Sequence, residues 1–325
     1  MLGGCLKTMP LGASLMELKS PIKILSVQNF RKRYGSMLGS RAEISDFEKT
    51  LIESNYNLMW LDSFEPKDYE DVKKTAIASN YFLEKGTIVK HRSVVEAVFN
   101  IANSIILELN KCITERGKIR NVELVVSDER IELNLKFYQT MYEALLPLIL
   151  SPIVYAFSLH NNIKDKAFQP RDDGRVKLDV IKKMKTWLIV PQNRLARGLN
   201  EHVRNAYAHS SYRILDGGFV ELVDINPYKP NIKWGPEVWS LSQLEKLTHK
   251  LWVNIFGIID ALIIFIMNNR KLARGSNWNE PKPLSIKLRK DEFHITAEKY
   301  TFERSFSLKE SNNNNGCFLK INTQP

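Results

Sequence analysis

The segment Arg204-Asn205-Ala206-Tyr207-Ala208-His209 combines residue types that could cleave a phosphodiester without a metal ion. Its arginine and histidine lie five positions apart, and an asparagine follows the arginine directly. An arginine can bind a phosphate group and stabilise the charge that develops on it. A histidine can accept and return a proton near neutral pH. Because RNA supplies its own nucleophile, the ribose 2′-hydroxyl, these two side chains are sufficient in principle to cleave an RNA strand.

An arginine–histidine pair at this spacing is weakly specific on its own, because such pairs arise easily by chance. Arg197 and His202 form a second pair with the same spacing. Arg204 differs from Arg197 because an asparagine follows it directly, which makes its pattern the rarer of the two. We therefore take Arg204 and His209 as the candidate catalytic residues.

Helix geometry sets a condition on this pair. Five residues of an ideal helix advance about 500°, so the side chains of Arg204 and His209 would point about 140° apart. They can share a substrate if the helix ends near His209, or if both reach into a cleft between two copies of the chain. The serines at 210 and 211, followed by a β-type run, predict that the helix ends there.

The elements around the motif are predicted to be mostly helical. Apolar periodicity predicts helices at 93–114, 131–159 (bent at its prolines), 177–188, from 191 to the motif, and 242–268. Two β-type runs within 212–224 flank Asp216-Gly217-Gly218, which is a hairpin turn signal. We therefore predict a mainly α fold, in which residues 91–272 form a four- or five-helix bundle with a small inserted β-hairpin.

Both flanking regions differ from this bundle in their pattern of apolar and polar residues. Residues 1–90 are predicted to form a mixed α/β N-terminal subdomain, with a strand at 22–30 and a helix at 44–55. Residues 273–325 are predicted to form a β-type C-terminal appendage, because apolar and polar side chains alternate over 284–308, and the run at 312–315 predicts an asparagine-rich loop.

The motif and its setting resemble the HEPN ribonucleases, all-helical proteins with an Arg-x4–6-His helix that faces its counterpart in a dimer. The resemblance covers residues 91–272, and only the six-residue motif is specific. It implies that Arg204 and His209 are the catalytic pair, that Asn205 is their polar companion, and that the active site is composite within a homodimer. It also implies an acidic or polar residue on an earlier helix, for which the candidates are Glu96, Glu108 and Glu143.

The function expected from this resemblance is metal-independent endonucleolytic cleavage of RNA, leaving 2′,3′-cyclic phosphate and 5′-hydroxyl ends. The resemblance further suggests a toxin or an abortive-infection effector against phage, with an antitoxin or regulatory partner. An alternative is a catalytically silent HEPN-like module that binds RNA, a nucleotide or a protein partner.

The charge of the chain favours a polyanionic partner such as RNA. The formal net charge is +11, and residues 164–204 hold eleven Lys/Arg against five Asp/Glu. We expect RNA contacts from this region and base stacking by Tyr207. The candidate RNA-binding residues are Lys182, Lys183, Lys185, Arg197 and Tyr207. A solvated charged face explains the lysines about as well, and packing is the alternative role for Tyr207.

Other chemistry finds little support in the sequence. Cys5, Cys112 and Cys317 are too scattered for a zinc site or a disulfide framework, and no nucleotide-binding or serine-hydrolase motif occurs. We therefore expect no metal, no cofactor and a cytoplasmic location. The apolar stretches 144–159 and 251–267 are shorter than a clean membrane span and contain prolines or polar residues, so we expect no membrane insertion.

Overall fold

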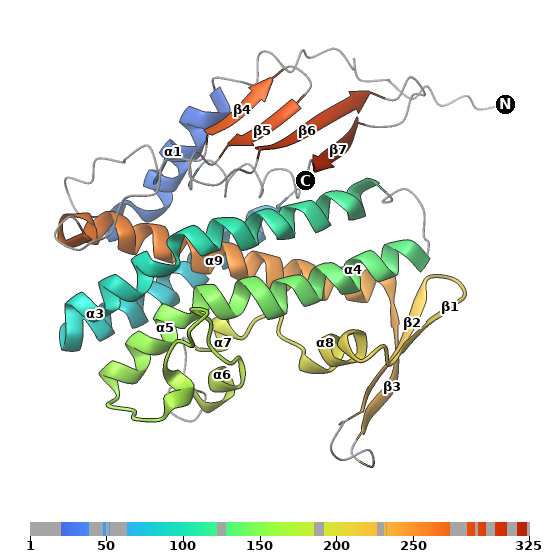
Figure 1. Ribbon diagram of the computed structural model, residues 1–325, viewed down its shortest axis with the longest axis horizontal. Helices are drawn as coiled ribbons and strands as arrows, with labels where there is room; N and C mark the ends of the chain where they lie inside the picture. The colour runs from blue at the N-terminus through green and yellow to red at the C-terminus, as the bar shows by residue number, and fades with distance from the viewer. Residues whose placement is uncertain are drawn as a thin grey trace.

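The computed structural model describes residues 21–38, 48–49, 52, 64–121, 128–184, 192–225, 231, 233–273, 285–289, 292–296, 303–310 and 317–323. The fold is mainly α-helical, as predicted, with a small three-stranded antiparallel sheet next to the helices (Figure 1). A second antiparallel sheet follows the last helix.

Two long helices form the centre of the molecule. Helix α3 (Pro66–Asn121) has 56 residues and is kinked at Lys90, whose backbone angles are not helical. Helix α9 (Leu241–Ala273) packs against α3, and Gly257 allows close contact because a Cβ there would lie 2.5 Å from the Cβ of Thr75. The domain boundary expected near residue 90 falls within α3, at its kink, and the division into domains stays a prediction.

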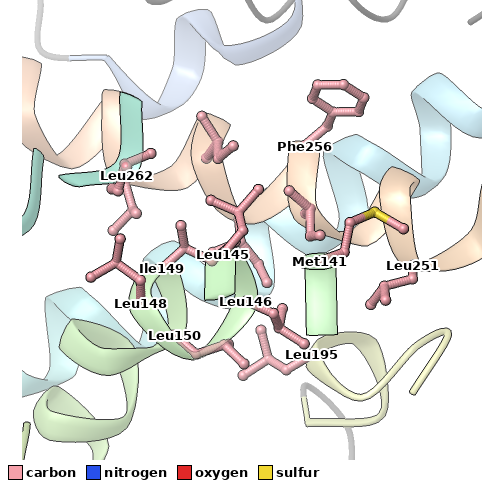
Figure 2. Packing of buried hydrophobic residues seen from close by; sticks show 14 of the residues in the cluster. Met141, Leu145, Leu146, Leu148, Ile149, Leu150, Leu195, Leu251, Phe256 and Leu262 are labelled. Carbon is pink, nitrogen blue, oxygen red and sulfur yellow. The ribbon is translucent and has the colours of Figure 1, made fainter. Parts of the chain in front are cut away.

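The predicted helix at 131–159 is confirmed as three consecutive helical segments. Helix α4 (Asp128–Thr140) leads into a π-helical turn, η2 (Met141–Leu145), and then into α5 (Leu146–His160). Apolar side chains of η2 and α5 pack with those of α9 in the core (Figure 2). A π-helical turn inserts an extra residue into a helix and is frequent at functional sites.

The prediction of one continuous helix from residue 191 into the motif is wrong. Helix α7 (Gln192–Leu195) ends in a turn, and α8 (Glu201–Ala208) begins only after Asn200. Gly198 in the turn has a φ of +79°, and a Cβ there would overlap the backbone of Leu251. The close approach of α9 therefore requires a break that apolar periodicity alone does not show. Helix α6 (Asp179–Met184) lies within the predicted 177–188 helix, whose last residues are outside the described part of the chain.

The predicted hairpin is confirmed, but it belongs to a larger sheet. Strands β1 (Tyr212–Leu215) and β2 (Phe219–Ile225) pair as expected, and β3 (Lys233–Ser240) adds a third antiparallel strand. Helix α8 packs against β2. This sheet leads directly into α9, which begins at Leu241.

The strand predicted at 22–30 is wrong, because this segment belongs to α1 (Pro21–Tyr34). Phe30 and Tyr34, one helical turn apart, are both fully buried, and the Tyr34 hydroxyl donates to Asp260 in α9 at 2.7 Å. Long-range burial on a helical spacing thus outweighs the local alternation of the sequence. A short 3-10 helix, η1 (Gly35–Met37), follows α1. Only residues 48, 49 and 52 of the helix expected at 44–55 are described.

The C-terminal segment is β-structured, as predicted. Its four strands pair in sequence order as an antiparallel sheet: β4 (Ser285–Arg289), β5 (Glu292–Thr296), β6 (Glu303–Glu310) and β7 (Cys317–Thr323). Strand β7 was not predicted, and the asparagine-rich run at 312–315 lies outside the described residues.

Two helical stretches, Asp128–His160 and Leu241–Asn269, are long and apolar enough to cross a membrane. Their apolar windows are 78% and 94% buried inside the protein, respectively. Core helices of proteins that do not cross a membrane pass the same test, so length and composition are weak evidence for insertion.

Candidate functional site

The turn before the motif is held by buried polar side chains from two neighbouring helices. The Tyr138 hydroxyl of α4 accepts from the backbone N–H of Asn200 at 2.7 Å and lies 2.9 Å from the carbonyl oxygen of Gly198. Asn254 of α9 donates to the carbonyl oxygen of Leu195 at 2.9 Å. Burial raises the pKa of Tyr138 far above its usual value, so this hydroxyl stays neutral. These contacts fix the point from which α8 begins.

Asn200 then starts α8 as its N-cap. Its side-chain oxygen accepts from the backbone N–H groups of His202 and Val203, at 3.0 and 3.2 Å. Such caps satisfy donors that have no partner within the helix. Val203 and Ala206 are the buried positions of α8, which leaves the other side chains of the helix partly accessible.

Arg204 points from α8 toward the π-helical turn η2. Its Nη1 lies 3.5 Å from Oε1 of Glu143, and its guanidinium lies 5.5 Å from the centre of the Tyr142 ring. The Arg204 Nε is buried without a hydrogen-bond partner among the described residues. Burial raises the pKa of Tyr142 to about 12, although the nearby Arg204 charge works in the opposite direction. Arg204 is thus held between an aromatic ring and a carboxylate.

Of the three acidic candidates, Glu143 is the one that contacts the motif. Glu108 is bound to Arg175 at 2.8 Å, and Glu96 is bound to Arg92 at 2.8 Å, so both are engaged elsewhere. Which of the three acidic residues contacts the motif depends on which earlier helix faces α8, and the sequence alone does not determine this.

Asn205 belongs to a polar cluster that joins α8 to β2. Its Nδ2 donates to Oδ2 of Asp224 at 2.9 Å, and the same oxygen lies 2.8 Å from Nδ1 of His202. The His202 ring also stacks on Trp234 of β3, with 4.8 Å between ring centres and 7° between planes. His202 is therefore fixed in place by an acid and an aromatic ring. No spacing signal marked Asp224 or Trp234, because only the strand pairing brings them to α8.

His209 lies at the end of the helix, as the sequence predicted. Helix α8 ends at Ala208, and His209 is its C-cap residue, with its backbone N–H donating to the carbonyl oxygen of Asn205 at 2.9 Å. The next residue, Ser210, has a φ of +52° and turns the chain away. The His209 side chain is exposed and forms no hydrogen bond within the described part of the chain. Its imidazole is therefore accessible to a substrate.

Within one copy of the chain, the two halves of the motif face different neighbours. Arg204 contacts η2, whereas Asn205 contacts Asp224 on β2. No direct contact joins Arg204 to His209 among the described residues. His209 follows Asn205 by four positions and therefore lies near the Asn205 side of the helix.

The candidate RNA-binding residues are spread over several environments. Arg197 lies in the turn between α7 and α8 and pairs with Asp71 of α3 at 2.5 Å. Lys183 pairs with Asp165 at 2.8 Å. The Lys182 side chain and all of Lys185 lie outside what the structure describes. The Tyr207 ring packs against Tyr212, with 5.6 Å between their centres.

No group of three or more His, Cys, Asp or Glu side chains among the described residues is placed to hold a metal ion.

Comparison with known proteins found no match: no family model, no curated protein and no solved structure is significantly similar to this chain.

Proposed function

We propose that the chain is a HEPN-like, metal-independent endoribonuclease that works as a homodimer. The observation that supports this most is the position of the motif on α8. The helix ends at His209, whose imidazole is exposed and forms no hydrogen bond with the described residues, and Arg204 is held one turn earlier by Glu143. A proton acceptor and a phosphate-binding cation thus lie on one short helix whose start is firmly anchored.

The proposed reaction needs no external nucleophile. The His209 imidazole removes the proton of a ribose 2′-hydroxyl, and the oxygen attacks the adjacent phosphorus. Arg204 stabilises the negative charge on the phosphorane oxygens. The bond from phosphorus to the 5′-oxygen then breaks, and this oxygen takes up a proton. The products are a 2′,3′-cyclic phosphate and a 5′-hydroxyl.

His202 is a suitable donor for the proton that the leaving 5′-oxygen takes up. Asp224 contacts its Nδ1, and the stacked Trp234 ring fixes the plane of the imidazole. An acid that orients a histidine in this way leaves the second ring nitrogen for proton transfer. The side chain of His202 is 38% exposed, so a substrate could reach it.

The divergence of Arg204 and His209 is the reason for proposing a dimer. Within a single copy, Arg204 faces η2, whereas His209 lies near the Asn205 side of the helix. Two copies related by a twofold axis can place the arginine of one against the histidine of the other. Each dimer would then hold two composite sites.

A catalytically silent binding module is the second candidate, and one observation favours it. The Arg204 guanidinium is already engaged by Glu143 and Tyr142, as a structural ion pair would be. Such a module would bind RNA, a nucleotide or a protein partner without turnover.

The biological setting proposed with the ribonuclease is a cytoplasmic toxin or abortive-infection effector, with an antitoxin or regulatory partner. This setting rests on the family resemblance alone.

The proposal is tested by incubating the purified protein with a mixed RNA pool in EDTA. Arg204→Ala and His209→Ala should each lower the rate by about a hundredfold or more. His160→Ala is a matched control, because His160 is also an exposed histidine at the end of a helix, and it should cleave like the parent. Equal rates for the parent and His209→Ala would overturn the assignment. Stoichiometric RNA binding without cleavage would favour the silent module.

A further inference from the structure

A pocket of about 430 Å³ lies on another part of the molecule, between α3, α4, α9 and the turn that precedes α8. Lys67 near the start of α3 and Arg116 near its end both line this pocket, so the two arms of α3 fold back on each other at the Lys90 kink. Arg130 of α4 and Lys250 of α9 complete its rim. The volume is in the range of small-molecule sites in proteins.

The pocket lining is strongly basic. Its only acidic residues among those described are Asp68 and Glu245, and both are engaged: Asp68 lies 3.1 Å from Nε2 of His249, and Glu245 accepts from Nε of Arg130 at 2.8 Å. Six lysines and arginines line the same space: Lys67, Arg116, Arg130, Arg197, Lys246 and Lys250. This imbalance creates a positive potential inside a concave surface, where the field is less screened than on an open face.

Three of these cations have no ion-pair partner within the described part of the chain. Lys67, Lys246 and Lys250 are exposed residues that reach the pocket from two different helices. Their ammonium groups are free to converge on a ligand with several negative charges. Lysines bind phosphate groups well as mobile point charges.

The buried wall of the pocket supplies a second, independent observation. Trp252 lines it and is 98% buried, since its exposed fraction is 2%. The indole Nε1 has no hydrogen-bond partner among the described residues. An indole N–H can only donate, and a buried donor without an acceptor is unfavourable. Trp252 therefore places an unsatisfied buried donor in the wall next to the space that a ligand would occupy.

We propose that this pocket binds a phosphorylated small molecule of nucleotide size that carries at least two phosphate charges. The three lysines favour a ligand with several negative charges, and the cavity is larger than a single phosphate ion needs. The space is bounded by four elements, which suits a compact ligand better than an RNA strand following a groove. The inference does not depend on the ribonuclease proposal, because no residue of the Arg204–His209 motif lines the pocket.

Calorimetric titration of the full chain with ATP tests this proposal, with adenosine and inorganic pyrophosphate as companion probes. ATP should bind in the micromolar range, adenosine should show no binding, and pyrophosphate should bind more weakly than ATP. The double variant Lys246→Glu/Lys250→Glu should weaken ATP binding about tenfold or more. Lys166→Glu, which makes the same charge change on the exposed η3 turn (Lys166–Phe168), should bind ATP like the parent.

Three results would overturn the proposal that this pocket binds a phosphorylated ligand of nucleotide size. The first is absence of ATP binding at millimolar concentration by the parent, whose folding is checked by circular dichroism. The second is equal affinity of the parent and the double variant, which would place the ATP elsewhere. The third is pyrophosphate binding as tight as that of ATP, which would show a simple anion site rather than a nucleotide pocket. None of these readouts requires RNA cleavage, so failure of the ribonuclease proposal leaves the test intact.

Discussion

At the residue scale, the Asp224 carboxylate joins α8 to the sheet. It is the acceptor for the Asn205 amide and the partner of His202. We expect Asp224→Ala to lower the free energy of unfolding by about 1–3 kcal/mol, because it leaves partly buried donors without an acceptor. Asp172→Ala, at an exposed turn residue, should change it by less than about 0.5 kcal/mol. Urea unfolding of both variants measures the difference, and equal stabilities would contradict the proposed role of Asp224.

The ion pairs of Asp71 predict that the stability of the protein depends on pH. Burial alone would raise the pKa of Asp71, but its hydrogen bonds and ion pairs with Arg197 and Arg194 outweigh this effect and lower it. A carboxyl whose pKa is lowered by folding stabilises the protein above its unfolded pKa of about 3.9, and this contribution is lost as the pH falls through the lower folded pKa.

Asp71→Asn should therefore lower the free energy of unfolding by about 1–3 kcal/mol at pH 7. The difference from the parent should shrink as the pH falls below about 4. Denaturant titrations of both proteins at a series of pH values test this. A difference that stays constant from pH 7 to pH 3 would show that the Asp71 charge has no part in it.

At the scale of elements, the break before α8 depends on Gly198. Its positive φ and its closeness to the Leu251 backbone leave no room for a Cβ. Gly198→Ala should destabilise the protein by more than about 2 kcal/mol, through backbone strain and displacement of α9. Gly35→Ala is the matched control, because a Cβ at that position meets none of the described residues within 4 Å. Thermal unfolding of the two variants should show a large decrease in Tm for the first and almost none for the second.

The sequence predicts an element well where the signal lies within the segment itself, as a long apolar repeat or a turn motif does. The apolar repeat of α9 and the Asp216-Gly217-Gly218 turn both identify structure that is present. The break at Gly198 and strand β3 could not be predicted in the same way. The break arises from the backbone of α9 on the far side of the turn, and β3 gains its stability by pairing with β2. Both are set by contacts between segments that are distant in sequence.

The same distinction applies to the candidate site. Arg204, Asn205 and His209 were found from their spacing, and the end of α8 at His209 was predicted from the residues that follow it. Their supporting partners, Glu143 and Asp224, depend on which helix and which strand lie next to α8. Nothing local to either acidic residue indicates that role.

At the scale of the whole molecule, the proposed composite site predicts complementation between two inactive variants. Arg204→Ala and His209→Ala, mixed in equal amounts and allowed to exchange subunits, form heterodimers in which one of the two sites keeps both residues. The mixture should recover about a quarter of the parent rate, since about half of the dimers are mixed and each has one intact site. A site contained within one copy of the chain predicts no recovery. Sedimentation of the parent should show a dimer.

The central claim, cleavage through the ribose 2′-hydroxyl without a metal, is tested most directly by the substrate itself. The purified protein is incubated in EDTA with an RNA that it cleaves and with the same strand carrying 2′-O-methyl groups. We predict that the RNA is cut to 2′,3′-cyclic phosphate and 5′-hydroxyl ends and that the methylated strand stays intact. Cleavage of the methylated strand, or cleavage of RNA only when magnesium is restored, would contradict the account.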